Sequence, residues 1–599
     1  MRSVILLAAV AAVGAGPRYH LNLARYFYPT PGVEHTRRVA LLAEVDGFLE
    51  TPASSLDTPS AFSGWLATYD SLSKRLNRHD LYVYLRAEED TNDHADAAAD
   101  DALEAEMTRM DSVAESILRQ LGAEKLHGYI AADATLAPYR YFIDSMLERA
   151  AHRPTPATAG APLLPPALDS LTASYKSLSN RLLTAGGGQR GTPEAAFAAR
   201  WNPYVANEDR FASLLLSIVR LNDDEARRQG FSGAPAAAYS GDRLTAPEVA
   251  GALQAARESD GYKRYVAVLS AAASRRLHVA ATALHAWDLD QADSYAPMKV
   301  PFPAALPLIL AAERPMGAAY AGQYARLFDP RSGRLEWCRA AACDKTGFSV
   351  GYAGLVSGVF YGSYTGDVNS MRAVAHEAGH AVHREFMAEN QPLAVYNAGP
   401  KFMLESCAIF NEFLFLDHLY RTAHTPAARA YYLNRFLDDA TFQVWGSARE
   451  TDLEQSIYSA AARGELHGAA DLDALTLRVF ARYTPRPSLD PRLKVYWARN
   501  RLFFTDPVYD VNYLFAGLLA LEYVQRLDED PAGFPTRYVA LLENGFTDSP
   551  QVLEKKFLGI DLDDTQGLVR NADDLIARRA HVLERLYDVR DGGAGSGPP

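Results

Sequence analysis

The sequence predicts a mainly α-helical protein with one small β-sheet, and two observations support this fold class. Apolar residues recur every three or four positions along most of the chain, for example in residues 62–76 and 102–121. This is the spacing of one face of a helix. Between residues 330 and 366 the pattern changes, and glycines separate short segments of Val, Phe and Tyr, which indicates short strands and turns. With 599 residues and 48% hydrophobic content, the chain can bury a large core.

The first sixteen residues have the pattern of a secretory signal peptide. Arg2 precedes an apolar run over residues 4–13, and small residues follow, with Val13 and Ala15 in the −3 and −1 places of a cleavage site. The run is shorter than the apolar segment that a membrane-spanning helix needs. We expect an exported protein, periplasmic or secreted, if the segment is cleaved, and a cytoplasmic one if it is an ordinary apolar N-terminal segment.

The rest of the chain divides into a helical region over 17–235, a second region over 236–590 and a flexible tail over 591–599. Proline-rich residues 151–166 and glycine-rich residues 184–188 predict loops in the first region. The second region opens with a helix start signal, because Thr245 is followed by a proline two residues on and by Glu248 three residues on. Further helices are predicted over 427–461, 470–482, 509–528 and 568–589.

Charge and cysteine content restrict the partners. The net charge of −13 and the lack of a long basic block make nucleic acid and anionic membranes unsuitable partners, and we expect no stable membrane insertion once the signal is removed. Cys338 and Cys343 are close enough to pair, which an oxidising compartment would permit, although spacing alone leaves this open. Cys407 lies in an apolar run and is predicted to be a buried thiol.

The stretch from His376 to His380 reads His-Glu-Ala-Gly-His. On a helix, positions i and i+4 project from one face, so His376 and His380 can hold one metal ion together. Flanking apolar positions and the absence of proline between 371 and 391 predict that helix. Glu377 is placed to accept a proton from a water molecule that the metal activates. Two surface histidines that share this spacing by chance are the alternative.

A second apolar run at 402–412 contains one carboxylate, Glu405, that needs a partner. Zinc in a hydrolase usually takes three protein ligands and leaves one position open for water. Turn residues between 390 and 400 predict a helix, a loop and an antiparallel helix, which would bring Glu405 over the histidines. The alternative is that Glu405 caps its own helix.

Together, these segments resemble the oligoendopeptidase F branch of the thimet oligopeptidase family of zinc metallopeptidases. The resemblance rests on the turn at 361–366, the motif at 375–383 and a glutamate 25 residues past His380. It implies an elongated, zincin-type fold of many helices, with the small sheet beside the zinc helix and a deep substrate channel. It also implies one Zn²⁺ per chain, held by His376, His380 and Glu405, and hydrolysis of short unfolded peptides with Glu377 as general base.

The resemblance extends to a C-terminal segment at 503–517. Tyr509 and Tyr513 match tyrosines that stabilise the oxyanion in this family, and they are one helical turn apart. Phe503 or Phe504 stands where the family has a histidine, which is a departure from its pattern. The alternative for the two tyrosines is simple packing.

Two further sets of residues complete the predicted site. An edge strand before the zinc helix would bind an extended peptide by main-chain pairing, although a purely structural hairpin is also possible; its residues are Phe360, Tyr361, Gly362 and Ser363. Ligand histidines usually donate their other N–H to an oxygen acceptor, and side chains near the ligands are predicted to support them: His383, Asn411 and Glu412.

Two other functions stay open at this point. A dipeptidyl carboxypeptidase would need a cationic clamp for a C-terminal carboxylate, and Arg499 or Arg501 could supply it. A non-catalytic exported peptide-binding protein is the other alternative, although the intact motif argues against it.

Overall fold

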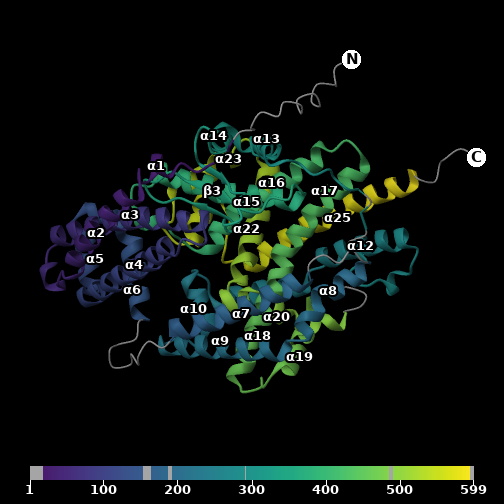
Figure 1. Ribbon diagram of the computed structural model, residues 1–599, viewed down its shortest axis with the longest axis horizontal. Helices are drawn as coiled ribbons and strands as arrows, with labels where there is room; N and C mark the ends of the chain where they lie inside the picture. The colour runs from purple at the N-terminus through teal and green to yellow at the C-terminus, as the bar shows by residue number, and fades with distance from the viewer. Residues whose placement is uncertain are drawn as a thin grey trace, which may run out of the picture. The chain divides into compact units, whose positions relative to one another are not determined.

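The computed structural model describes residues 18–152, 164–186, 192–289, 292–293, 295–483 and 490–593 (Figure 1). The predicted signal peptide, the loop over 153–163 and the last six residues lie outside these ranges. The chain divides into two compact units, each assembled from separate segments. The first unit comprises Met1–Thr51, Gly64–Ser112 and Met298–Asn397, and the second comprises Pro52–Ser63, Val113–Pro297 and Ala398–Pro599. The boundary predicted between 235 and 236 falls inside a helix of the second unit, so it does not separate compact units.

The first unit combines N-terminal helices with the segment that carries the histidine motif. Its helices are α1 (Leu23–Tyr26), α2 (Pro31–Leu49), α3 (Pro59–Glu89), α4 (His94–Leu121), α13 (Phe302–Ala312), α14 (Gly317–Phe328) and α15 (Val368–Asn390). Of α3 and α4, only the parts from Gly64 and up to Ser112 belong to this unit. The predicted helical runs at 62–76 and 102–121 are confirmed inside α3 and α4.

The small sheet predicted at 330–366 is confirmed, and its strand order corrects one prediction. Strands β1 (Leu335–Trp337), β2 (Gly347–Val350) and β3 (Gly358–Tyr361) lie in the order β1-β3-β2. β3 pairs with β1 in parallel and with β2 in antiparallel fashion. The prediction that Phe360 and Tyr361 belong to an edge strand is therefore wrong, because both main-chain edges of β3 are already paired. The edge strands of the sheet are β1 and β2.

Helix α15 begins and packs as its sequence predicts. The side chain of Asp367 accepts a hydrogen bond from the backbone N–H of Ser370, 2.9 Å away, and so caps the helix. The apolar stripe through Val374, Ala378 and Val382 is fully buried. Glu385, on the same helix, forms an ion pair with Arg334 next to β1 (3.1 Å) and accepts a hydrogen bond from the backbone N–H of Ser357, 2.8 Å away. These contacts fix α15 against the sheet.

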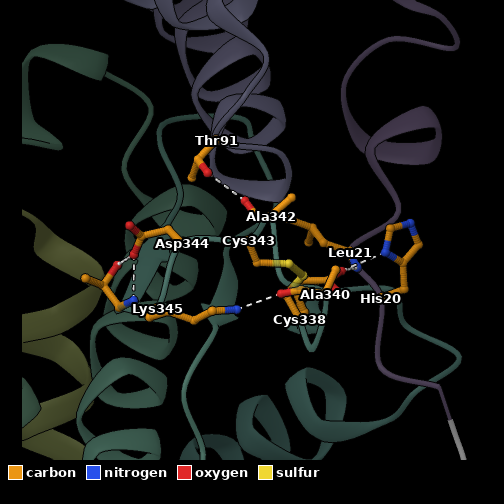
Figure 2. Close-up of a disulfide and its surroundings, with 11 residues drawn as sticks. His20, Leu21, Thr91, Cys338, Ala340, Ala342, Cys343, Asp344 and Lys345 are labelled. Carbon is orange, nitrogen blue, oxygen red and sulfur yellow. Dashed lines mark hydrogen bonds and ion pairs between the residues drawn. A yellow bond between two sulfur atoms is a disulfide. The ribbon is translucent and has the colours of Figure 1, made fainter. Parts of the chain in front are cut away.

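Cys338 and Cys343 form a disulfide in the loop between β1 and β2 (Figure 2). The backbone N–H and the hydroxyl of Thr91 both donate to the carbonyl of Ala342, at 2.9 and 2.8 Å. Lys345 donates to the carbonyl of Ala340 at 2.6 Å. The disulfide and these hydrogen bonds hold the loop that leads into β2.

The second unit is helical in its described residues. Its helices are α5 (Ala123–Ala132), α6 (Arg140–Ala151), α7 (Leu164–Gly186), α8 (Pro193–Val205), α9 (Glu208–Arg228), α10 (Ala234–Gly241), α11 (Ala246–Glu258), α12 (Gly261–Leu277), α16 (Lys401–Thr422), α17 (Pro426–Thr441), α18 (Ser447–Ala462), α19 (Ala469–Tyr483), α20 (Tyr496–Arg499), α21 (Leu502–Thr505), α22 (Asp510–Glu529), α23 (Phe534–Asn544), α24 (Pro550–Leu558) and α25 (Thr565–Gly593). The capping box predicted at Thr245 is present.

Three helix contacts organise this unit. α16 packs along α22, and α25 packs against α12 and α17, as Figure 1 shows for the yellow C-terminal helix. The helix predicted over 427–461 is interrupted by a π-helical turn, η7 (Phe442–Gly446), which packs against α22. Cys407 on α16 is the buried thiol that was predicted. None of the helices in the described ranges is long and apolar enough to cross a membrane.

Candidate metal and catalytic site

His376 and His380 lie one turn apart on the same face of α15, as the motif predicts. Their ring centroids are 4.8 Å apart with the ring planes at 88°, and each ring has a nitrogen within 4.8 Å of a nitrogen of the other. Both side chains are half-buried. Two imidazoles in this arrangement can bind one divalent ion such as zinc through one nitrogen each.

Glu377 lies beside the sheet, close to Gly347 in β2. A methyl group added to Gly347 in β2 would lie 3.5 Å from Cγ of Glu377 and 2.6 Å from the ring of Tyr361 in β3. Burial, followed by the charge of Glu377, raises the pKa of Tyr361 to about 12. The Glu377 side chain therefore lies beside β2, and Gly347 is needed there because any side chain would meet the tyrosine ring.

His383 is buried on the inner side of α15. Burial, together with the positive charges of Arg384 and His380, lowers the pKa of His383 to about 3. The imidazole is therefore neutral at ordinary pH, and in a neutral imidazole one nitrogen donates a hydrogen bond and the other accepts one. Its predicted role in supporting a ligand stays a prediction.

Glu405 lies on α16 in the second unit, and its carboxylate is held by Tyr509. The Tyr509 hydroxyl donates a hydrogen bond to Oε1 of Glu405 at 3.1 Å. Burial and the negative charge of Glu405 raise the pKa of Tyr509 well above its usual value, so the hydroxyl keeps its proton. The Nζ of Lys401 lies 5.0 Å from the centre of the Tyr509 ring. That Glu405 joins the histidines as a third ligand stays a prediction.

Tyr513 lies beside Tyr509 at the start of α22, with ring centroids 5.3 Å apart. In the described part of the chain its hydroxyl makes no hydrogen bond, whereas the hydroxyl hydrogen of Tyr509 is taken by Glu405. Burial, followed by the charge of Glu405, raises the pKa of Tyr513 as well. Of the two tyrosines, Tyr513 is therefore the one with a hydrogen available for a substrate oxygen.

Phe503 and Phe504, of which one is predicted to replace a histidine, have buried rings in the second unit. The ring of Phe504 stacks on Tyr175 with centroids 4.0 Å apart, and it also contacts Phe211. These side chains contribute packing and no hydrogen-bond donor. Asn411 and Glu412, further along α16, are also buried, and the amide of Asn411 donates to the carbonyl of Cys407 in its own helix at 2.6 Å.

Two features of the site carry no recognisable signal in the sequence. Val508, directly before Tyr509, has φ of +63°, which is strained for a β-branched residue. Its backbone N–H donates to Oε1 of buried Glu454 at 2.8 Å, which holds the chain in this conformation. The second feature is β2 at the edge of the sheet, because strand order depends on pairing between distant segments.

Comparisons with known proteins agree with these observations. Residues 364–572 match the profile of Peptidase family M3. The oligoendopeptidase F homolog of Lactococcus lactis subsp. lactis is 27% identical over 226 residues, which are 37% of this chain and 36% of that protein. The group B oligopeptidase PepB of Streptococcus agalactiae is 25% identical over 229 residues, again 37% of this chain and 36% of that protein. The matched segment thus spans about a third of the length of these curated relatives.

Solved structures extend the likeness in fold. The crystal structure of oligoendopeptidase F from Enterococcus faecium matches with a TM-score of 0.65 and 19% identity, over 92% of this chain and 98% of that one. PZ peptidase A matches with a TM-score of 0.70 and 15% identity, over 90% of this chain and 97% of that one. The mainly helical fold with a small sheet is confirmed, and the histidine motif, Glu405 and both tyrosines all fall within the matched segment, so residues 364–572 of this chain are similar to peptidase family M3 and to oligoendopeptidase F proteins.

Proposed function

We propose that the protein is a zinc-dependent endopeptidase that hydrolyses short, unfolded peptides. The observation that carries this proposal is the arrangement on α15, where His376 and His380 share one face and Glu377 lies beside β2. The match of residues 364–572 to a peptidase family supports it, as do the oligopeptidases among the relatives.

One zinc ion would be held by His376, His380 and Glu405. The donor set fits zinc, which favours imidazole nitrogens and carboxylate oxygens and leaves a position open for catalysis when three protein ligands bind it. When bound there, zinc would supply Lewis-acid chemistry by lowering the pKa of a water molecule and polarising the scissile carbonyl.

Glu377 would act as the general base and then as the general acid. Its carboxylate takes a proton from the attacking water and delivers it to the leaving amine. Tyr509 orients Glu405 through its hydrogen bond, and Tyr513 would donate its hydroxyl hydrogen to the oxyanion that develops on the substrate carbonyl.

The main chain of β2 (Gly347–Val350) would bind the substrate in an extended conformation. Among the described residues β2 pairs with β3 alone, so its other edge can pair with a peptide strand. Pairing through the main chain gives affinity with little preference for side chains. β2 also lies next to Glu377, so a peptide on this edge would pass close to the base.

We also infer export to an oxidising compartment. The signal-like N-terminal sequence and the Cys338–Cys343 disulfide support it, since disulfides persist mainly outside the cytosol. A cytoplasmic protein would instead keep both thiols reduced.

The test combines zinc content with cleavage of a mixed peptide pool, with and without a chelator. We expect about one zinc per chain and internal cleavage of the peptides, which chelator abolishes and added zinc restores. A protein that binds peptides and zinc without cleaving them would be a peptide-binding protein, and release of C-terminal dipeptides alone would indicate a dipeptidyl carboxypeptidase.

A further inference from the structure

A cavity of about 380 Å³ lies in the second unit, beside the start of α22. Ligand sites commonly have volumes of about 300–1,000 Å³. Its walls come from α7, from the end of α8, from η7 and the start of α18, from α20 and α21, and from α22. We call it the Arg499 cavity, and define it by Lys176, Arg499, Arg501, Phe442 and Tyr513 among its lining residues.

Three cationic side chains line this cavity. Arg499 is half-buried with its guanidinium 5.1 Å from the centre of the Trp201 ring, which fixes its position. Arg501 is exposed, and one of its nitrogens donates to Oγ1 of Thr505 at 3.3 Å. Lys176 on α7 is exposed as well. In the described part of the chain, no carboxylate forms an ion pair with any of the three.

The two carboxyl groups of the cavity wall are buried and already hold hydrogen bonds. The Tyr496 hydroxyl donates to Glu450, and the amide of Asn500 donates to Oδ2 of Asp510 at 2.9 Å. Burial raises the pKa of both carboxyls, which reduces their negative charge. The accessible charge of the cavity is therefore positive.

The Arg499 cavity adjoins the residues of the proposed active site. Tyr513 lines it, the Tyr513 ring lies 5.3 Å from the Tyr509 ring, and the Tyr509 hydroxyl binds Glu405. Phe442, 54% exposed, adds an apolar surface to the same wall. A cationic pocket with an apolar wall suits an amino-acid residue that carries a carboxylate.

We propose that the Arg499 cavity binds a carboxylate of the peptide substrate, chiefly through the guanidinium groups of Arg499 and Arg501. This inference rests on the proposed peptidase function and adds a preference to it. Guanidinium is suited to the task because it binds carboxylate in a planar, two-pronged geometry. The carboxylate can come from the C-terminus of the peptide or from an acidic side chain, and the test separates the two sources.

The test uses one internally quenched peptide in three forms. The first ends in a free carboxylate, the second in an amide, and the third in an amide with aspartate as the last residue. We expect kcat/KM for the free carboxylate to exceed that for the amide by about ten- to a hundredfold, through KM, because hydrogen bonds to charged groups are strong. If kcat/KM for the aspartate form returns to the value for the free carboxylate, the cavity binds an acidic side chain. If kcat/KM stays at the value for the amide, the cavity binds the C-terminal carboxylate.

Variants connect the preference to this cavity. Arg501→Gln should reduce the ratio of kcat/KM for the carboxylate peptide to kcat/KM for the amide peptide, and Arg501→Glu should bring this ratio below one. Arg499→Lys keeps the charge but loses the planar fork, so an intermediate ratio is expected. Arg585→Gln, on the exposed face of α25, is the matched control and should leave the ratio unchanged.

Equal kcat/KM for the carboxylate and the amide, with cleavage that chelator abolishes, would overturn the inference and leave the proposed function standing. Binding separates the two claims further. The carboxylate and amide peptides, labelled for fluorescence anisotropy, are titrated into the Glu377→Gln protein, which needs no turnover. Equal affinity there overturns the carboxylate site whatever the activity, and a carboxylate preference that Arg501→Glu removes supports it.

Discussion

Removing the hydroxyl of Tyr509 tests whether Glu405 is a metal ligand held by this tyrosine. The Tyr509 hydroxyl donates one hydrogen bond, 3.1 Å long, to Oε1 of Glu405 in a partly buried setting. A hydrogen bond to a charged group contributes about 1.5–3 kcal/mol. Since about 1.4 kcal/mol is a factor of ten, Tyr509→Phe should weaken zinc binding by about ten- to a hundredfold, the range found when partners of metal ligands are lost.

The assay is competition for zinc between the protein and a chelator of known affinity, followed by kcat at saturating zinc. Tyr513→Phe is the matched control, because in the described residues its hydroxyl makes no hydrogen bond to Glu405. That variant should keep zinc affinity and lose about a hundred- to a thousandfold in kcat, as expected for an oxyanion donor. Wild-type zinc affinity in Tyr509→Phe would refute the assignment of Glu405 as a ligand that Tyr509 orients.

Three other changes have definite expected outcomes. Glu377→Gln should lower kcat by orders of magnitude while zinc content stays near one per chain, and near-full turnover would rule out Glu377 as the base. Gly347→Ala places a methyl group 2.6 Å from the Tyr361 ring, so we expect a loss of about 1–3 kcal/mol in the free energy of unfolding and a lower kcat/KM. The control is Gly322→Ala on α14, which has open space around it and should not destabilise the protein. Burial raises the pKa of Glu454 to about 8, so between its usual pKa of 4.5 and that value the folded state holds a proton that the unfolded state has lost, and the free energy of unfolding falls as pH rises. In Glu454→Gln, the free energy of unfolding, measured in urea from pH 5 to 8, should fall less with pH. An unchanged dependence on pH would contradict the raised pKa.

The sequence by itself determined those features that depend on neighbouring positions. A spacing of four residues places His376 and His380 on one face of a helix. The same periodicity predicted a helix over 509–528, which is α22 (Asp510–Glu529), and it predicted the presence of α15 and α16, although α16 continues to Thr422, past the predicted run at 402–412. Likewise, the capping box at Thr245 needs only residues three apart. The geometry of the helical backbone fixes which nearby positions share a face, so such patterns can be read from the sequence alone.

Only the tertiary structure decided which distant segments meet. Strand order β1-β3-β2 made β2 the edge next to Glu377, although β3 is the strand nearer to α15 in sequence. The hydrogen bond from Tyr509 to Glu405 joins residues more than a hundred positions apart, and it assigns different roles to two tyrosines that look alike in sequence. The Arg499 cavity likewise draws its walls from several separated segments. These features arise from pairing and packing between elements, and the spacing of residues along the chain does not specify which elements pack together.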